Sequence, residues 1–222
     1  MFKTASADVV DLPLQRYIAS TGKPVMVAVG MATLGEIEQV CEIYRKEKNS
    51  NLILLHCVSN YPCSDQSINL KVMQTLKDAF HLPVGYSDHS EGTMAATLSI
   101  SLGAKVIEKH FTLRKDDEGP DHKASDTPEQ FRELVTNVRR AELILGDSVK
   151  RRQEEENQMA QVSRKSIHVK KTVRKGEKIA AEHLILKRPG TGIMPAEINR
   201  VIGRIARISM HKDYQISYMD LE

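Results

Sequence analysis

Two histidines stand at the carboxyl ends of two successive segments that read as β-strands. His89 lies in "GYSDHSEG" (85–92), and His110 lies in "KVIEKHFT" (105–112). Because successive parallel strands end at the same edge of a sheet, the two imidazoles could share one metal ion, with oxygen donors and water completing its shell. Such a nitrogen-and-oxygen site suits manganese, iron or zinc. The alternative is that each histidine forms hydrogen bonds within a turn at the end of its own strand.

Polar side chains accompany the histidines at the same predicted edge. Alternate residues of a strand share a face, which places Ser87 with His89 and Glu108 with His110. The residues between them, Asp88 and Lys109, therefore point to the opposite face. Polar residues also follow other predicted strands, namely Ser6, Asp8, Ser59 and Asn60. This distribution is typical of the active-site mouth of a (β/α)8 barrel.

A long loop, "LRKDDEGPDHKAS" (113–125), leaves the fifth predicted strand at this mouth. Loops of this length in compact domains are often lids or binding loops. This one could carry Asp121 and His122 over the pocket. The alternative is an acidic loop that is simply solvated.

The segments that must position these residues alternate between short apolar runs and amphipathic stretches. This pattern predicts a parallel sheet covered by helices. No Gly-x-Gly-x-x-Gly turn follows a strand, which disfavours a nucleotide-binding open sheet. About five βα units are too few for an eight-stranded barrel, so we predict a partial (β/α)8 TIM barrel. The predicted strands are 2–6, 25–30, 51–59, 82–87 and 105–111, and the clearest helices are 33–48, 68–80 and 127–146.

The pattern changes after this α/β region. We predict a barrel portion over 1–146, a polar and partly helical linker over 147–165, and a small β-rich domain over 166–222. The stretch "SIHVKKTVRKGEKI" predicts a strand, a turn at Lys175-Gly176 and a second strand. A Gly/Pro loop at 188–195 and a short helix at 196–203 follow.

Composition excludes several classes of protein. The 222 residues carry a net charge of only +3, and no basic stripe is interleaved with aromatic residues, so we expect no nucleic-acid partner. No apolar run is long enough to span a bilayer, and the first ten residues do not resemble a signal peptide. Three cysteines without a Cys-x-x-Cys pair read as reduced thiols of a cytoplasmic protein: Cys41, Cys57 and Cys63.

Several motifs together resemble the sialic acid synthase family, which comprises N-acetylneuraminate synthases and their relatives for other nonulosonic acids. They are "KTASADV", "LLHCVSNYP", "GYSDHSEG", "IEKHFT" and "GPDHKAS". Further on, "VRKGEKI" and "HLILKRPGTGI" resemble the family's C-terminal antifreeze-like domain, also called the SAF domain. The resemblance covers essentially the whole chain, in family order.

The resemblance implies a transferase that forms a carbon–carbon bond. Family enzymes condense phosphoenolpyruvate with an open-chain N-acetylhexosamine to give a nine-carbon 2-keto sugar acid and phosphate. His89 and His110 match the two histidines that bind the metal, usually Mn(II), which acts as a Lewis acid on the sugar aldehyde. N-acetylmannosamine is the default acceptor, and 2,4-diacetamido sugars leading to legionaminic or pseudaminic acid fit the same motifs.

Other residues match substrate positions of the family. Lys3, Ser6 and Ser87 match positions that hold phosphoenolpyruvate, where an ammonium group and hydroxyls suit its oxygens. Lys3 and Ser6 can act together only if the first strand ends between them, because strand alternation would separate them. Asp8 stands where many members carry a glutamate, a carboxylate that moves protons or holds the sugar.

Sugar-side positions are matched as well. Ser59, Asn60 and Tyr61 match a substrate-facing segment, and Asp121 matches a carboxylate that binds the sugar. Arg188 matches the arginine that the SAF domain extends into the partner subunit's active site, where it contacts the N-acyl group. The resemblance therefore implies a domain-swapped homodimer.

The sequence departs from the family at its beginning. Family members carry a further segment, with three strands, before the stretch that matches "FKTAS". We therefore expect a fragment, a truncated product or one half of a split enzyme, with unpaired strand edges that a complementing N-terminal chain could cover. Alone, these residues are expected to bind substrate weakly and to turn over little. The alternative is a non-catalytic remnant that serves as an association module.

Overall fold

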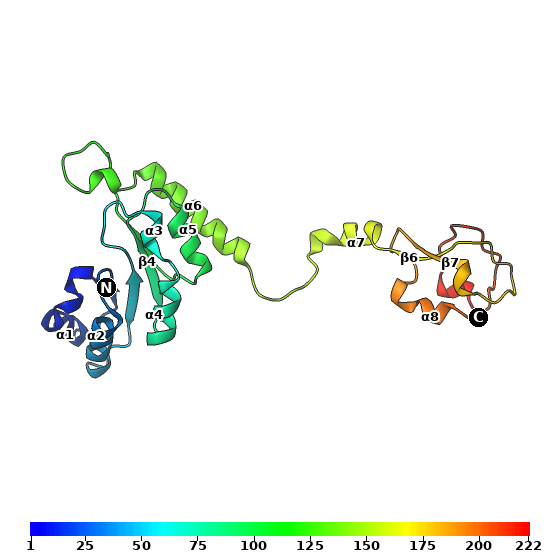
Figure 1. The fold of residues 1–222 in the computed structure, drawn as a ribbon, viewed down its shortest axis with the longest axis horizontal. Coiled ribbons are helices and arrows are strands. Elements are labelled where there is room, and N and C mark those ends of the chain that lie inside the picture. The colour runs from blue at the N-terminus through cyan, green and yellow to red at the C-terminus, as the bar shows by residue number, and fades with distance from the viewer. The chain divides into compact units, whose positions relative to one another are not determined.

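The computed structural model describes residues 1–222, and its contacts divide the chain into two compact units. The first unit is Met1–Asp147 and the second is Ser148–Glu222. Figure 1 shows an α/β first unit and a second unit with short strands and little helix. Each unit is described by itself below.

The first unit is built on a five-stranded sheet in the order β1-β2-β3-β4-β5, in which every neighbouring pair is parallel. The predicted partial barrel is therefore confirmed. Each strand is shorter than its predicted run, and β4 begins two residues later and ends one residue further on than its run. Their bounds are β1 Phe2–Thr4, β2 Val25–Ala28, β3 Leu52–His56, β4 Val84–Asp88 and β5 Ile107–Lys109.

Helices follow the strands in the first unit, as parallel connections require. A capping box between Thr33 and Glu36 fixes the start of the second helix. The predicted helix over 68–80 begins only at Val72, because Asn69 adopts the left-handed region (φ 45°) and ends a separate short helix at Ile68. The helices are α1 Leu12–Ser20, α2 Leu34–Lys46, α3 Asp65–Ile68, α4 Val72–Phe80, α5 Met94–Ser101 and α6 Pro128–Leu145.

The two faces of the sheet differ in their packing. The face that carries Val27, Leu54 and Tyr86 packs against the helices in the main hydrophobic core. The other face has only a small apolar cluster around Ala28 and Leu55, and it carries the polar residues of the candidate site. The predicted site residues within the strands, Lys3 and Ser87, therefore lie on one face, together with Glu108.

A single ion pair shows that the sheet is curved toward this second face. The Lys3 Nζ lies 3.2 Å from Glu108 Oε1, although the two residues belong to the outermost strands β1 and β5. In a flat sheet these strands would be about 19 Å apart, which a lysine and a glutamate cannot span. The sheet therefore curls around the polar face like part of a barrel wall.

The second unit differs from the predicted strand–turn–strand. β6 (Ser166–Val169) pairs antiparallel with β7 (Leu184–Lys187), and not with the residues just after Gly176. The expected second strand makes only an isolated bridge, between Lys178 and Ile205. The hairpin prediction was wrong because the intervening residues pair with the C-terminal segment, around a core that includes Ile167, Val201 and Ile216.

Short helices complete the second unit. α7 (Asn157–Ser163) lies in the stretch predicted as a linker, and α8 (Ile198–Val201) lies within the predicted helix at 196–203. The Gln161 carbonyl accepts a hydrogen bond of 2.7 Å from Gly190 N, so α7 contacts the Gly/Pro loop. None of the helices in either unit combines the length and apolar character needed to cross a bilayer.

Candidate functional site

The structure brings the rings of His89 and His110 together. His89 follows β4, His110 follows β5, and their ring centroids lie 5.4 Å apart in an edge-to-face arrangement. Tyr61 packs on both rings, and its ring centroid lies 4.1 Å from that of His89 and 5.1 Å from that of His110. The two imidazoles and one phenol therefore form a single cluster beyond the carboxyl ends of the two strands.

His89 is held in a defined protonation state. Its Nδ1 lies 2.7 Å from the carbonyl oxygen of Val58, which can only accept, so Nδ1 carries the hydrogen. Nε2 is then unprotonated and can accept from the Ser87 hydroxyl, whose Oγ lies 3.3 Å away. Burial lowers the pKa of His89 below its usual value, and the nearby His110 lowers it further. The ring is therefore neutral at neutral pH, as a metal ligand must be.

The loop 113–125 returns to the end of β5 and places a carboxylate near His110. Asp126 N donates to the His110 carbonyl at 2.9 Å, which anchors the end of the loop. Asp121 Oδ2 lies 3.9 Å from His110 Nδ1, while His122 Nδ1 lies 2.7 Å from Thr112 Oγ1. Asp121 thus borders the histidine pair, and His122 is engaged within the loop.

A second cluster of small polar groups surrounds Gly30, just after β2. The Gly30 amide lies 3.0 Å from Ser6 Oγ and 3.2 Å from Cys57 Sγ, and these two side-chain atoms are 3.1 Å apart. A Cβ atom on Gly30 would lie 2.6 Å from Ser59 Oγ. Two hydroxyls and one thiol, from the residues that follow β1 and β3, therefore meet around Gly30.

The ion pair between Lys3 and Glu108 lies on the same face. Both side chains are about one-third exposed, so solvent and ligands reach them. The second carboxylate oxygen, Glu108 Oε2, is buried and has no hydrogen-bond partner. A buried carboxylate oxygen without a donor is costly, which indicates a place for a further donor or cation.

Other predicted site residues make local contacts instead. Asp8 Oδ2 accepts from Ala5 N at 3.0 Å and caps its own turn, and Asn60 Nδ2 donates to Pro62 O at 3.2 Å. Arg188 belongs to the second unit, where its Nε donates to Ser163 O at 3.0 Å. Each of these contacts lies within the residue's own turn or its own unit.

Sequence reasoning missed Gly30 and Cys57 as members of the site. A signal for Cys57 existed, because it lies two residues before Ser59 and alternation places both on one face. Gly30 gave no chemical signal of its own, and its role follows only from how closely three side chains approach it.

We expect the first unit to lose stability as the pH falls below about 6.5, the usual pKa of histidine. Burial lowers the pKa of His56, although a contact of 2.7 Å to the Ile68 carbonyl opposes the shift, and burial likewise lowers that of His89. The unfolded chain then binds more protons than the folded one, so stability is fully present above the unfolded pKa and declines below it. Urea unfolding between pH 5 and pH 8 checks this. His56→Gln should flatten the slope, and an equal slope in this variant would contradict the assignment.

The fold and the site together define a class of protein: a partial (β/α)8 barrel with a histidine pair and clustered hydroxyls at its mouth, followed by a small β-rich domain. Residues 1–150 match the NeuB family, and residues 164–222 match the SAF domain. The chain therefore belongs to the NeuB family and carries a C-terminal SAF domain.

Individual relatives agree with this assignment. The N,N'-diacetyllegionaminic acid synthase of Legionella pneumophila is 44% identical over 213 residues, which cover 94% of this chain and 59% of the relative. The synthase of the same name from Campylobacter jejuni is 41% identical over 215 residues, covering 96% and 64%. This chain thus spans about three fifths of the length of these relatives.

A solved structure is similar over the majority of the chain. The N-acetylneuraminic acid synthetase of Leptospira borgpetersenii, crystallised with citrate, has a TM-score of 0.66 and 38% identity. The match covers 71% of this chain and 55% of that one.

Proposed function

We propose that this chain provides the metal site and part of the phosphoenolpyruvate site of a nonulosonic acid synthase. The reaction would join phosphoenolpyruvate to an open-chain N-acetylhexosamine and release phosphate. One observation carries the proposal: the rings of His89 and His110 lie edge to face with centroids 5.4 Å apart, and the hydroxyls of Ser6 and Ser59 gather around Gly30 after other strands of the same sheet, in a chain of the NeuB family.

His89 and His110 are the residues proposed to hold a divalent cation, and Mn²⁺ is the cation proposed. The unprotonated Nε2 of His89 and the buried Glu108 Oε2 fit such a group, because one offers a lone pair and the other has no hydrogen-bond partner. No group of three or more His, Cys, Asp or Glu side chains converges there, so oxygen ligands from water and substrate belong to the proposal. When bound, the cation would polarise the sugar aldehyde toward attack.

The anionic substrate finds suitable partners on the same face. Lys3 offers an ammonium group, and the hydroxyls of Ser6 and Ser87 can donate to carboxylate or phosphate oxygens. Glu108 Oε1 lies 3.2 Å from the Lys3 ammonium and holds it on this face. We propose that phosphoenolpyruvate oxygens take over part of this contact when they bind.

The carboxylates of Asp8 and Asp121 and the phenol of Tyr61 are proposed to act on the sugar substrate. Asp121 borders His110, and Tyr61 covers both imidazoles, so each can contact a sugar placed over the histidine pair. Asn60, which precedes Tyr61, is proposed to contact the same sugar. Asp8 is proposed to hold the sugar or to move a proton, which requires it to give up its present role as a cap within its own turn.

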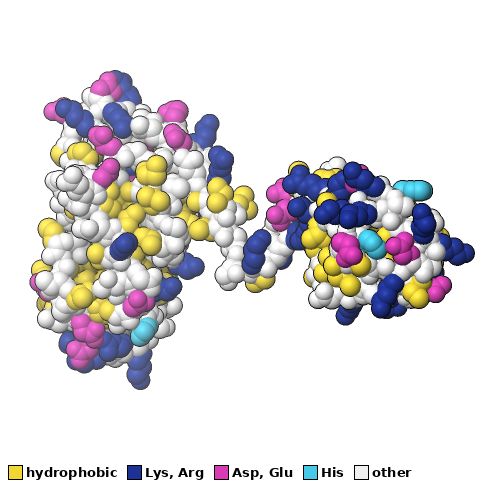
Figure 2. All heavy atoms as spheres, turned by 45° about the vertical axis from the view of Figure 1, so that its right-hand side comes forward, with side chains coloured by type: hydrophobic (Ala, Val, Ile, Leu, Met, Phe, Trp, Pro, Cys, Tyr) yellow, Lys and Arg dark blue, Asp and Glu magenta, His cyan; other side chains and the backbone are white.

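A domain-swapped homodimer is proposed as the assembly. Lys and Arg outnumber Asp and Glu in the second unit, whereas the reverse holds in the first. Figure 2 shows basic side chains gathered over the second unit. Opposite net charges favour docking of the second unit of one copy onto the first unit of another. The three free cysteines support the proposed cytoplasmic location.

Arg188→Ala is expected to weaken sugar binding by about 10-fold or more, with phosphoenolpyruvate affinity nearly preserved, because loss of a charged hydrogen bond costs about 1.5–3 kcal/mol. Arg200→Ala is the matched control, since Arg200 is an exposed arginine of the same unit that pairs only with Glu197. Titration calorimetry with each substrate separates the effects. A loss confined to phosphoenolpyruvate would mean that Arg188 has been assigned to the wrong substrate.

A 2,4-diacetamido sugar is the second candidate acceptor beside N-acetylmannosamine. The identity of 44% to a protein named N,N'-diacetyllegionaminic acid synthase favours it. Parallel titrations with the two sugars, in the presence of Mn²⁺ and phosphoenolpyruvate, decide between them by their relative affinities.

The proposed function is tested by binding, because these residues alone are expected to turn over little. Phosphoenolpyruvate should bind in the presence of Mn²⁺, and Ser6→Ala should weaken that binding. A chain that binds neither Mn²⁺ nor phosphoenolpyruvate would contradict the proposal and favour a non-catalytic association module. Near-normal turnover by these residues alone would overturn the expectation of low activity.

A further inference from the structure

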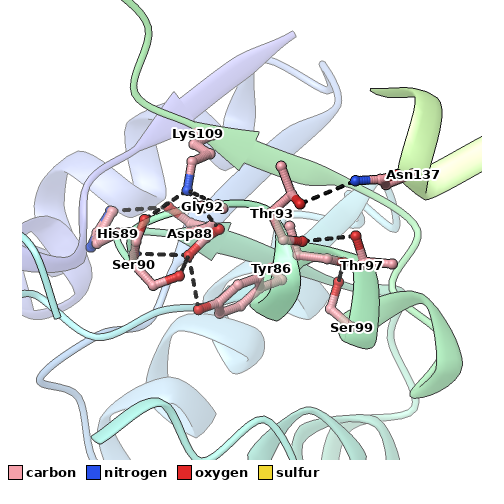
Figure 3. Close-up of polar contacts among 12 residues, drawn as sticks. Tyr86, Asp88, His89, Ser90, Gly92, Thr93, Thr97, Ser99, Lys109 and Asn137 are labelled. Atoms are coloured by element: carbon pink, nitrogen blue, oxygen red, sulfur yellow. Dashed lines mark hydrogen bonds and ion pairs between the residues drawn. The ribbon is translucent and has the colours of Figure 1, made fainter. Parts of the chain in front are cut away.

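A buried ion pair lies on the opposite face of the strands that carry the histidines. Lys109 Nζ is 2.9 Å from Asp88 Oδ2, and the side chains are 1% and 0% exposed. Lys109 directly precedes His110, and Asp88 directly precedes His89. Figure 3 shows the lysine reaching from β5 over the end of β4.

All the hydrogen-bonding capacity of the ammonium group is used. Besides Asp88, Lys109 Nζ donates to the carbonyls of Ser90 at 2.7 Å and Gly92 at 3.0 Å (Figure 3). An ammonium group has three donors, so each has one acceptor. Lys109 thereby ties β5 to the turn that follows β4 and contains His89.

The carboxylate of Asp88 is satisfied equally well. Its Oδ1 accepts from Ser90 N at 2.9 Å, from Ser90 Oγ at 2.6 Å and from the Tyr86 hydroxyl at 3.2 Å. The turn after Asp88 is therefore fixed through both its backbone and a side chain. Such a fully satisfied buried network is rigid and specifies one arrangement.

The backbone ladder does not reach the histidines. The pairing of β4 with β5 ends at Asp88↔Lys109, one residue before each imidazole. β5 has three residues, so few backbone hydrogen bonds fix where its end lies. Beyond the ladder, the ion pair supplies the cross-strand connection between the two histidine-bearing ends.

Stability alone is a weak explanation for this pair. Buried ion pairs are often no more stabilising than apolar residues of the same volume, whereas they can impose one specific geometry. The position of the pair, directly before both histidines in the sequence, gives that geometry a use.

We propose that Lys109 is a positioning residue that, through Asp88 and the 89–92 turn, holds His89 and His110 at the separation needed to bind one divalent cation. This inference rests on the proposed function. It adds that affinity for the cation depends on a lysine that does not touch the cation.

The test is the affinity of the full chain for Mn²⁺ in the Lys109→Met variant, measured by electron paramagnetic resonance of free Mn²⁺. The dissociation constant is expected to rise by about 10–100-fold, the usual effect of removing a group that orients a metal ligand. Lys105→Met is the matched control, because Lys105 is an exposed lysine shortly before β5. The Lys105→Met variant should bind Mn²⁺ with the affinity of the wild type.

A second control separates positioning from loss of stability. Leu76→Ala opens a cavity in the helix-covered core, since Leu76 is 1% exposed in α4 and lies outside the site. This variant should be less stable but bind Mn²⁺ as the wild type does. Ser90→Ala, which removes one hydroxyl from Asp88, serves if Lys109→Met fails to fold, and it should raise the dissociation constant by a smaller factor.

A metal-free readout adds an independent check. Long-range ¹H–¹⁵N spectra should show His89 protonated at Nδ1 in the wild type, because Val58 O accepts from it. They should show mixed tautomers in Lys109→Met, and in Ser90→Ala if the first variant does not fold.

The outcomes are distinct. Wild-type protein that binds no Mn²⁺ would overturn the proposed function and this inference with it. If the wild type binds Mn²⁺ and the dissociation constant is unchanged in Lys109→Met, the inference alone would be overturned. The same holds for an unchanged dissociation constant in Ser90→Ala, where that variant has to be used.

Discussion

Replacing either His89 or His110 by alanine should abolish stoichiometric binding of Mn²⁺ and raise its dissociation constant by more than about 100-fold, because removal of a ligand exceeds the effect of removing a group that only orients one. The two rings lie 5.4 Å apart, so both can reach a cation placed between them. Loss of one ring leaves a single nitrogen ligand, which is too few to hold the ion.

The control for this prediction is His211→Ala, which removes an exposed histidine of the second unit. Metal content after gel filtration should be unchanged in the control and lost in both site variants. Equal metal content in all four proteins would remove the metal site from the account, and loss in only one site variant would mean that the ion is not shared.

Gly30→Ala should be the most damaging single-atom addition in the site. The new Cβ would lie 2.6 Å from Ser59 Oγ, 2.8 Å from Cys57 Sγ and 2.9 Å from Ser6 Oγ. All three atoms must move apart, and such overpacking typically costs about 1–3 kcal/mol. Because two of them are hydroxyls of the proposed substrate site, we expect phosphoenolpyruvate binding to fall about 100-fold, which corresponds to a loss of roughly 2.7 kcal/mol.

Gly35→Ala is the matched control, since a Cβ at Gly35 in α2 meets nothing within 4 Å. This substitution should be neutral or should stabilise the helix by up to about 1 kcal/mol. Titration calorimetry and urea unfolding on both variants give the comparison. Normal phosphoenolpyruvate affinity in Gly30→Ala would separate the hydroxyl cluster from substrate binding.

The parallel sheet could be predicted from sequence because each strand is a short apolar run. Such a run, alternating or continuous, is a strong local signal of a strand. The break between α3 and α4 could not, because Asn69 in the left-handed region looks like any polar helix residue in a sequence. The pairing of β6 with β7 was missed because the partner strand begins at Leu184, well beyond the nearest turn. Local turn signals favour pairing between strands that are close in the sequence, whereas the packing of this unit pairs β6 with a strand further along the chain.

The part of the candidate site that lies at converging strand ends could be predicted from sequence. The alternation rule and the end-of-strand position anticipate how His89 and His110 come to lie together. The curvature that brings Lys3 to Glu108 depends on the whole sheet and has no local signal. Nor does sequence disclose that Lys109 and Asp88 are buried with a full set of partners, since charged residues at strand ends are more often solvated.

Pulsed electron paramagnetic resonance of the Mn²⁺-loaded chain, with histidine labelled by ¹⁵N, tests whether His89 and His110 bind one cation together. We expect electron spin-echo modulation from two imidazole nitrogens on one ion, reduced to one nitrogen or none in His89→Ala and in His110→Ala. Modulation from no histidine, or from one histidine that persists in both variants, would contradict it.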